Sequence, residues 1–207
     1  KNFVDNPVLG DQPTLQQPVN VRTRFDAQAR IVASYTGQEL IWKHALGNTP
    51  VTTGSGPYTH VFEPDNTLPT GLTCEFKRGT ATNAETGEGC KIGRLRFSAA
   101  VDQYAQIELD FIGETSNSAA VGTPAYATSR VYVGAWQSGD LTHDGNTYCL
   151  NALEFTVDNS LSEPTMMGCA REPTRDYARI SGRFTVEYDA DTLYTAFTAE
   201  TVADGHV

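Results

Sequence analysis

The feature that most constrains the fold is a segment in which apolar and charged residues alternate on both sides of one turn. Residues 93–97 (Gly-Arg-Leu-Arg-Phe) and residues 107–111 (Ile-Glu-Leu-Asp-Phe) both alternate at every position. A period of two is typical of a β-strand with one buried face. If the segment folds about Asp102, Phe97 faces Ile107 and Leu95 faces Leu109, and the next apolar pair is Gly93 with Phe111.

The same fold about Asp102 also pairs opposite charges on the other face. Arg96 then faces Glu108, and Arg94 faces Asp110. A slip of one residue would move every side chain to the wrong face, so the pattern specifies the register. Each exposed ion pair stabilises by only ~0.2–1 kcal/mol, and its main value is to fix that register. We therefore predict an antiparallel hairpin whose polar face carries Arg94, Arg96, Glu108 and Asp110.

The rest of the chain is read mainly as strands and turns. Residues 37–46 are the exception and predict a short helix that ends at Gly47. Further strands are expected at 29–35, 130–136, 147–157 and 179–188, with turns at Asp144-Gly145 and Asp158-Asn159 and a short terminal helix after Asp189 or Asp191. This predicts a mostly β, single-domain β-sandwich or barrel over residues 25–207 with one or two short helices.

The first 24 residues have a different character. They contain Pro7, Pro13 and Pro18 with several Gln and Asn residues and no periodic pattern. Because proline fixes φ and has no backbone N–H, residues 1–24 are expected to form an extended N-terminal arm.

Composition excludes several classes of function. The 207 residues are 39% hydrophobic and 19% charged, which does not favour disorder. No apolar run approaches the ~20 residues that span a bilayer, so no membrane insertion is predicted. The formal net charge is −10, which argues against a protein that grips nucleic acid through clustered cations. The basic residues that stand out form one late segment: Arg171, Arg175, Arg179 and Arg183.

No pattern in the sequence indicates catalysis, a metal site or a cofactor. The four cysteines are far apart and lack a Cys-x-x-Cys pair, so zinc is not expected. Cys74 and Cys90 could face each other across a hairpin, but free thiols are favoured over a disulfide. The histidines are dispersed, and His143-Asp144-Gly145 is typical of a turn. Trp42, Trp136 and the tyrosines are read as core residues rather than as a sugar-binding platform. The remaining cysteines are Cys149 and Cys169.

Taken in order, these segments resemble the tail tube (major tail) proteins of long-tailed bacteriophages. The resemblance covers about residues 25–198. Its motifs are strand patterns punctuated by Gly and Asn, and they contain no catalytic signature. The segments that carry it are residues 37–47, 62–73, 86–92, 104–113, 153–159 and 180–188.

The resemblance implies a structural subunit of the virion tail, assembled in the host bacterial cytoplasm. Such subunits form hexameric rings that stack into a tube with other tail proteins, and the genome passes through the tube without tight binding. Ring closure would pair the open edges of the sheets. The polar hairpin face would then line the lumen or a subunit contact. The segment from Arg171 to Arg183 is expected to meet an acidic surface on an adjacent subunit.

Two alternatives remain open at this point. The first is another ring-forming tail protein, either a terminator or a tail-tip protein, which keeps the architecture but forms a single ring. The second is a secreted β-sandwich that binds carbohydrate through Trp136 and the tyrosines. An enzyme is not predicted.

Overall fold

The computed structural model describes residues 2–4, 19–22, 24–55, 58–77, 82–120, 122–123, 132–134, 140–143, 146–162 and 172–186. Over these residues the chain is mostly β, as predicted. One helix, α1 (Glu39–Leu46), lies among the described elements. The strands are β1 (Asn2–Val4), β2 (Val19–Arg22), β3 (Phe25–Val32), β4 (Val51–Thr53), β5 (Thr59–Val61), β6 (Leu72–Phe76), β7 (Asn83–Ala100), β8 (Gln106–Gly113), β9 (Thr115–Ala120), β10 (Asp140–His143), β11 (Asn146–Asp158), β12 (Leu161–Ser162), β13 (Thr174–Arg175) and β14 (Arg179–Val186).

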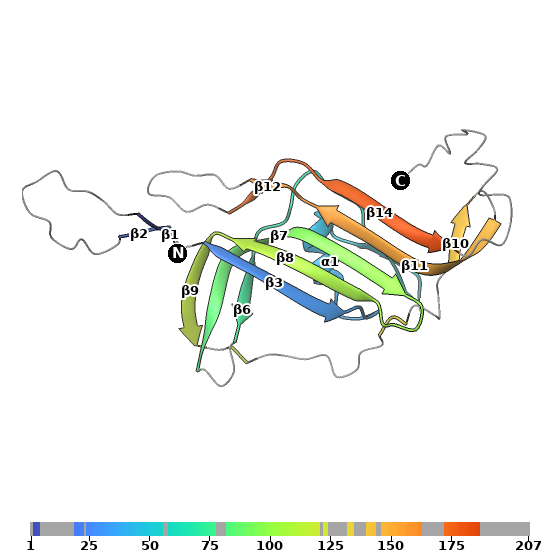
Figure 1. Cartoon of the computed structure of the whole chain (residues 1–207). Coiled ribbons are helices and arrows are strands. Elements are labelled where there is room, and N and C mark those ends of the chain that lie inside the picture. Colours follow the sequence, from blue (N-terminus) through green and yellow to red (C-terminus); the bar gives the residue numbers. More distant parts are fainter. Residues whose placement is uncertain are drawn as a thin grey trace, which may run out of the picture.

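The main sheet is built around the long strand β7 (Figure 1). Its second half pairs with β11 on one side and with β8 on the other, and these pair in turn with β14 and β3. The first half of β7 pairs instead with β6 and β9. All of these pairings are antiparallel. The strand β7 therefore belongs to two parts of the sheet, an arrangement consistent with the predicted sandwich class.

The predicted hairpin is present with the predicted register over most of its length. Leu95 lies opposite Leu109, Arg96 opposite Glu108 and Phe97 opposite Ile107. The turn includes Asp102, whose φ of 61° is in the left-handed region that aspartate tolerates better than most residues.

One pair predicted for this hairpin is wrong. Ile92, not Gly93, lies opposite Phe111, because the register shifts between Ile92 and Arg94. Such a shift is a β-bulge, in which one strand carries an extra residue that the partner does not match. The carbonyl of the extra residue, Gly93, accepts a hydrogen bond from the backbone N–H of Asn159 at 2.8 Å.

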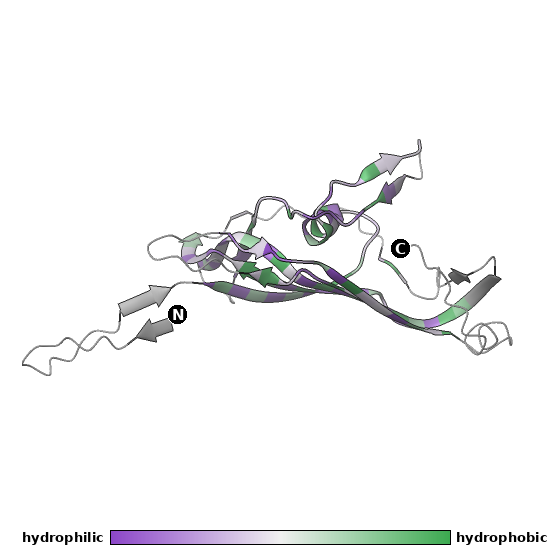
Figure 2. Cartoon of the chain, turned by 90° about the horizontal axis from the view of Figure 1, so that it is seen from above, coloured by the Kyte–Doolittle hydropathy of each residue, from purple (hydrophilic) through white to green (hydrophobic). Residues whose placement is uncertain are grey.

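The core lies between the apolar face of the sheet and α1. Leu95 and Ile107 are fully buried, and Phe97 and Phe111 pack against the same cluster, as predicted for this face. In Figure 2, where the sheet is seen nearly edge-on, the helix lies on one side of it. Ala45 contributes the fully buried position of α1 to the cluster.

The helix ends where the sequence predicts. Gly47 has a φ of 105° and its N–H donates to the Lys43 carbonyl at 2.8 Å, which is the arrangement of a left-handed C-terminal cap. His44, on the core side of the helix, has a lowered pKa because burial disfavours its charged form and Lys43 and Lys91 add repulsion. Leu40 is 56% exposed, so the core-facing stripe consists of Ile41, Trp42, Ala45 and Leu46.

Trp42 belongs to an aromatic cluster rather than to an open platform. Its ring lies 5.9 Å from that of Phe155, 6.3 Å from that of Phe97 and 6.4 Å from that of Phe62, measured between centroids. The interpretation of Trp42 as a core residue is therefore confirmed. The same interpretation is wrong for five tyrosines, because each of them is between 46% and 64% exposed: Tyr35, Tyr58, Tyr104, Tyr132 and Tyr177. Trp136 lies outside the described residues.

The strand expected at 29–35 is present with other bounds, because β3 begins at Phe25 and ends at Val32. The turn expected at Asp144-Gly145 lies outside the described residues. The strands expected at 147–157 and 179–188 correspond to β11 and β14. Of the strand expected at 130–136, only 132–134 are described, and they form bridges to Ser34 and Tyr104. The expected terminal helix lies outside the described residues. Within residues 1–24, β1 and β2 pair with each other, and the division into arm and domain stays a prediction.

Three of the four cysteines are described, and all three are free: Cys74, Cys90 and Cys149. The preference for free thiols over a Cys74–Cys90 disulfide stays a prediction. These two residues do lie on the paired strands β6 and β7. A hydrogen bond with Cys74, together with burial, raises the pKa of the Cys90 thiol. Cys169 lies outside the described residues.

Candidate functional site

The four residues predicted for the polar hairpin face lie together on one face of the main sheet. Arg94 Nε is 3.4 Å from Asp110 Oδ2, and Arg96 Nη1 is 3.5 Å from Glu108 Oε2. These are the partners that the register predicts. They lie on the side of the sheet opposite the core because residues alternate between faces along each strand.

The ion pairs continue across the sheet on both sides of the hairpin. Glu154 of β11 is 3.0 Å from Arg96 and 3.2 Å from Arg183 of β14. On the other side, Arg30 of β3 is 3.5 Å from Glu108. One row of alternating charge therefore crosses all five strands from β14 to β3. We call it the charge row: Arg183, Glu154, Arg96, Glu108 and Arg30.

The complete face carries nearly equal numbers of basic and acidic residues. Strand pairing places a second row beside the charge row, with Arg179 opposite Asp158, Asp158 opposite Arg94, and Arg94 opposite Asp110. We call this surface the charged face. Its ionisable members are Arg24, Arg30, Arg94, Arg96, Arg179, Arg183, Asp26, Glu108, Asp110, Glu154 and Asp158. Its charge is nearly balanced, although the chain has a formal net charge of −10.

The charged face fixes strand alignment more than it adds stability. The side chains of the charge row are between 28% and 78% exposed, and exposed pairs contribute only ~0.2–1 kcal/mol each. Glu154 is the most shared member. Its hydrogen bond with Arg96 lowers the pKa of the Glu154 carboxyl, and the same contact raises the pKa of Arg96.

Replacing Glu154 by glutamine should therefore make unfolding less sensitive to acid. The pKa of Glu154 is lower in the folded chain than its usual value of about 4.3. Its stabilising effect is thus present above that usual value and is lost as the pH falls through the lowered pKa. Urea unfolding should show a small loss of stability for Glu154→Gln at pH 7 that closes as the pH is lowered.

Glu63→Gln is the matched control, because Glu63 is exposed and forms no ion pair among the described residues. It should unfold like the parent chain at every pH. A Glu154→Gln difference that stays constant down to pH 2 would contradict the assigned role of Glu154.

The predicted basic segment does not form one surface. Arg179 and Arg183 lie on β14 and belong to the charged face, whereas Arg171 lies outside the described residues. Arg175 is engaged within the chain, because its guanidinium donates to the carbonyls of Ala45, Leu46 and Asp65. Whether the remaining arginines meet another subunit stays a prediction.

Arg175 and Asn159 together close the C-terminal end of α1. The Asn159 side chain is fully buried, and its Nδ2 donates to the carbonyls of Ala45 at 2.9 Å and Ile92 at 2.8 Å. Its Oδ1 accepts a hydrogen bond from Arg175 Nη2 at 2.6 Å. Burial lowers the pKa of Arg175, and Asp65 opposes that shift. Sequence reasoning identified Asn159 only as part of a turn.

The described residues form neither a deep ligand pocket nor a cluster of metal-binding side chains. An open hollow of about 270 Å³ lies on the charged face between Arg30, Glu154 and Arg183, below the roughly 300–1,000 Å³ of typical ligand pockets. Within the same described ranges, no three His, Cys, Asp or Glu residues are placed to hold a metal ion. No described helix is long and apolar enough to cross a membrane.

Comparison with known protein families gives one match. The model of a family described as phage tail tube protein matches residues 1–205, which is nearly the whole chain. A comparison with curated proteins finds no match.

Proposed function

The chain belongs to the phage tail tube protein family, and from that premise we propose that its copies form hexameric rings that stack into a hollow conduit for the genome. Members of this family are structural subunits of the virion tail and assemble with themselves and with other tail proteins. The six-fold ring, the stacking and the passage of DNA through the tube are the parts that we propose.

The observation that carries the proposal is a five-strand part of the main sheet that ends in two open strands. Among the described residues, β3 pairs only with β8, and β14 pairs only with β11. Each of these edge strands has eight residues. Open edges of that length invite pairing with other chains, and closing the sheet into a barrel removes the edges. A ring of copies supplies that closure.

The charged face supports a lumenal position. Most of its arginines are held in ion pairs by acids of neighbouring strands, as in the contacts of Arg94, Arg96 and Arg183. A groove that grips DNA needs unpaired cations that replace the counterions of several phosphates. A nearly balanced face offers few of them, so DNA would pass without being retained.

The carbohydrate-binding alternative has less support, although five described tyrosines are exposed. Trp42 packs among phenylalanine rings, and the hollow on the charged face is small and open. A ring-forming terminator or tail-tip protein would have the same open edges, so it is separated from the tube subunit by the form of the assembly.

Electron microscopy of the purified full-length chain tests the proposal. We expect long hollow tubes, with six-fold symmetry in end-on views and in averaged cross-sections. Isolated rings that never stack would favour the terminator. Monomers at all concentrations, or rings of another symmetry, would contradict the proposed hexameric tube.

A further inference from the structure

The direction of the two edge strands determines how neighbouring copies can join. Five strands of the main sheet follow the order β14, β11, β7, β8, β3, and each neighbouring pair is antiparallel. Four antiparallel steps bring the chain back to its starting direction. Thus β3 and β14 point the same way, as their arrows do in Figure 1.

A ring keeps this direction from copy to copy. Rotation about the axis of the tube does not reverse a strand relative to that axis, so β14 of one copy meets β3 of the next pointing the same way. We propose that neighbouring copies join by parallel pairing of β14 with β3, which makes the barrel antiparallel within each copy and parallel at each junction. This rests on the proposed ring and adds the strands and the polarity of its contact.

The charge row indicates that the junction is staggered. The row begins with Arg183 and ends with Arg30, so a straight continuation would place these two arginines of neighbouring copies side by side. Like charges directly opposite each other are destabilising. A barrel in any case needs a stagger, because its strands tilt relative to the axis.

The size of the stagger follows from sheet dimensions. Five strands about 4.8 Å apart span about 24 Å, so a tilt of about 40° accumulates a shift of about six residues at about 3.3 Å per residue, and a shift of four corresponds to a tilt of about 29°. An odd shift would exchange the two faces of the sheet, so the shift is four or six. A shift of four toward the N-terminus of β3 places Arg183 beside Asp26, whereas a shift of six places it beside Arg24.

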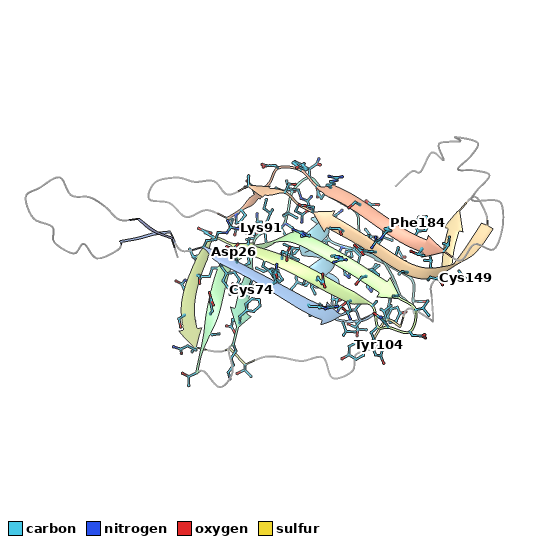
Figure 3. All side chains as sticks on the ribbon, viewed as in Figure 1. Asp26, Cys74, Lys91, Tyr104, Cys149 and Phe184 are labelled. Atoms are coloured by element: carbon cyan, nitrogen blue, oxygen red, sulfur yellow. The ribbon has the colours of Figure 1, made fainter. Side chains whose placement is uncertain are left out.

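Charge selects the shift of four. Asp26 is an acid on the charged face that already pairs with Arg24 at 2.6 Å, and its side chain is still 56% exposed and open to a second partner. Arg183 is 78% exposed. A shift in the opposite direction would carry β14 past the end of β3 at Val32. Figure 3 shows Asp26 and Phe184 on these two strands.

The apolar face of the junction fits the same stagger. Phe184 is 50% exposed on the side of β14 that faces the core. In the staggered register it would lie beside Ala27 of the neighbouring copy, and Val186 would lie beside Ala29. Small alanines leave room for the phenylalanine ring, which the junction would then cover.

Disulfide cross-linking of assembled particles tests polarity and stagger together. Neighbouring strands are about 4.8 Å apart, within the range that a disulfide spans. After oxidation, the double variants Gln28→Cys/Thr185→Cys and Arg24→Cys/Ser181→Cys should both form covalent ladders up to the hexamer on non-reducing gels. The four single variants are the controls for links made by the native cysteines.

Two further double variants test the alternative junctions. If the junction were antiparallel and still placed residue 28 beside residue 185, residue 32 would lie beside residue 181. In that case Val32→Cys/Ser181→Cys would cross-link. Gln28→Cys/Ser181→Cys would cross-link in a parallel junction without stagger. Efficient linking of the first overturns the polarity, and efficient linking of the second overturns the stagger. Electron microscopy of the same samples separates the two levels: rings without the expected links contradict only this junction, whereas the absence of rings contradicts the proposed function.

Discussion

Replacing Asn159 by alanine should lower the free energy of unfolding by about 3 kcal/mol, since a buried polar group left without a partner costs ~1–3 kcal/mol. The Asn159 amide is the donor to the carbonyls of Ala45 and Ile92, and its oxygen accepts from Arg175. The variant leaves the Ile92 carbonyl without this donor and removes an acceptor from a partly buried cation. Urea unfolding followed by far-UV circular dichroism measures the loss.

The strand that precedes Asn159 provides a matched control for this prediction. Asn151 is exposed on β11, and Asn151→Ala should change the unfolding free energy by less than about 0.5 kcal/mol, as is usual for surface substitutions. If Asn159→Ala were no more destabilising than Asn151→Ala, the bonds that join α1 to the bulge of β7 would not contribute to stability.

Replacing Gly87 by alanine should destabilise the chain by about 2–3 kcal/mol, near the upper end of the range for overpacked cores. A Cβ at residue 87 would lie 2.3 Å from the ring of Phe25. That ring is only 2% exposed, and its other neighbours include Phe76 at 5.6 Å between centroids. The ring has little space in which to move, so the backbone of β7 or β3 must shift. Thermal and urea unfolding both measure the effect.

Gly93→Ala is the control on the same strand. The nearest atom to a Cβ at residue 93 is 3.5 Å away, an ordinary contact, so this variant should be close to neutral. Equal destabilisation by Gly87→Ala and Gly93→Ala would show that strand propensity, rather than contact with Phe25, determines the cost.

The local pattern of the hairpin was enough to predict its register, but not its irregularity. Alternating apolar and charged residues on both sides of Asp102 determine which residues meet, and the observed pairs of Leu95 and Arg96 agree. The bulge at Gly93 leaves no trace in that pattern. Its carbonyl is bonded to Asn159, and a contact so distant in sequence can be located only when the strands are arranged in space.

Local alternation also predicted part of the candidate site, but not the contacts between residues that are distant in sequence. The polar face of the hairpin followed from alternation within one segment. Its extension to Arg30, Glu154 and Arg183 requires the order of five strands, which local periodicity does not give. Arg175 resembles its neighbours in a run of exposed arginines, yet it lies against the carbonyl ends of α1. Nothing in the spacing of arginines distinguishes a surface cation from one that closes a helix.

The length of β7 has a consequence for how the subunit opens. Its 18 residues are paired on both sides, with β6 and β9 along one half and with β8 and β11 along the other. Neither part of the sheet can separate without breaking bonds to a strand that the other part also uses. Partial opening is therefore coupled across the molecule, and the amides of β7 should exchange with solvent only through the global transition. A chain that opens only as one unit is protected against local fraying of its edge strands.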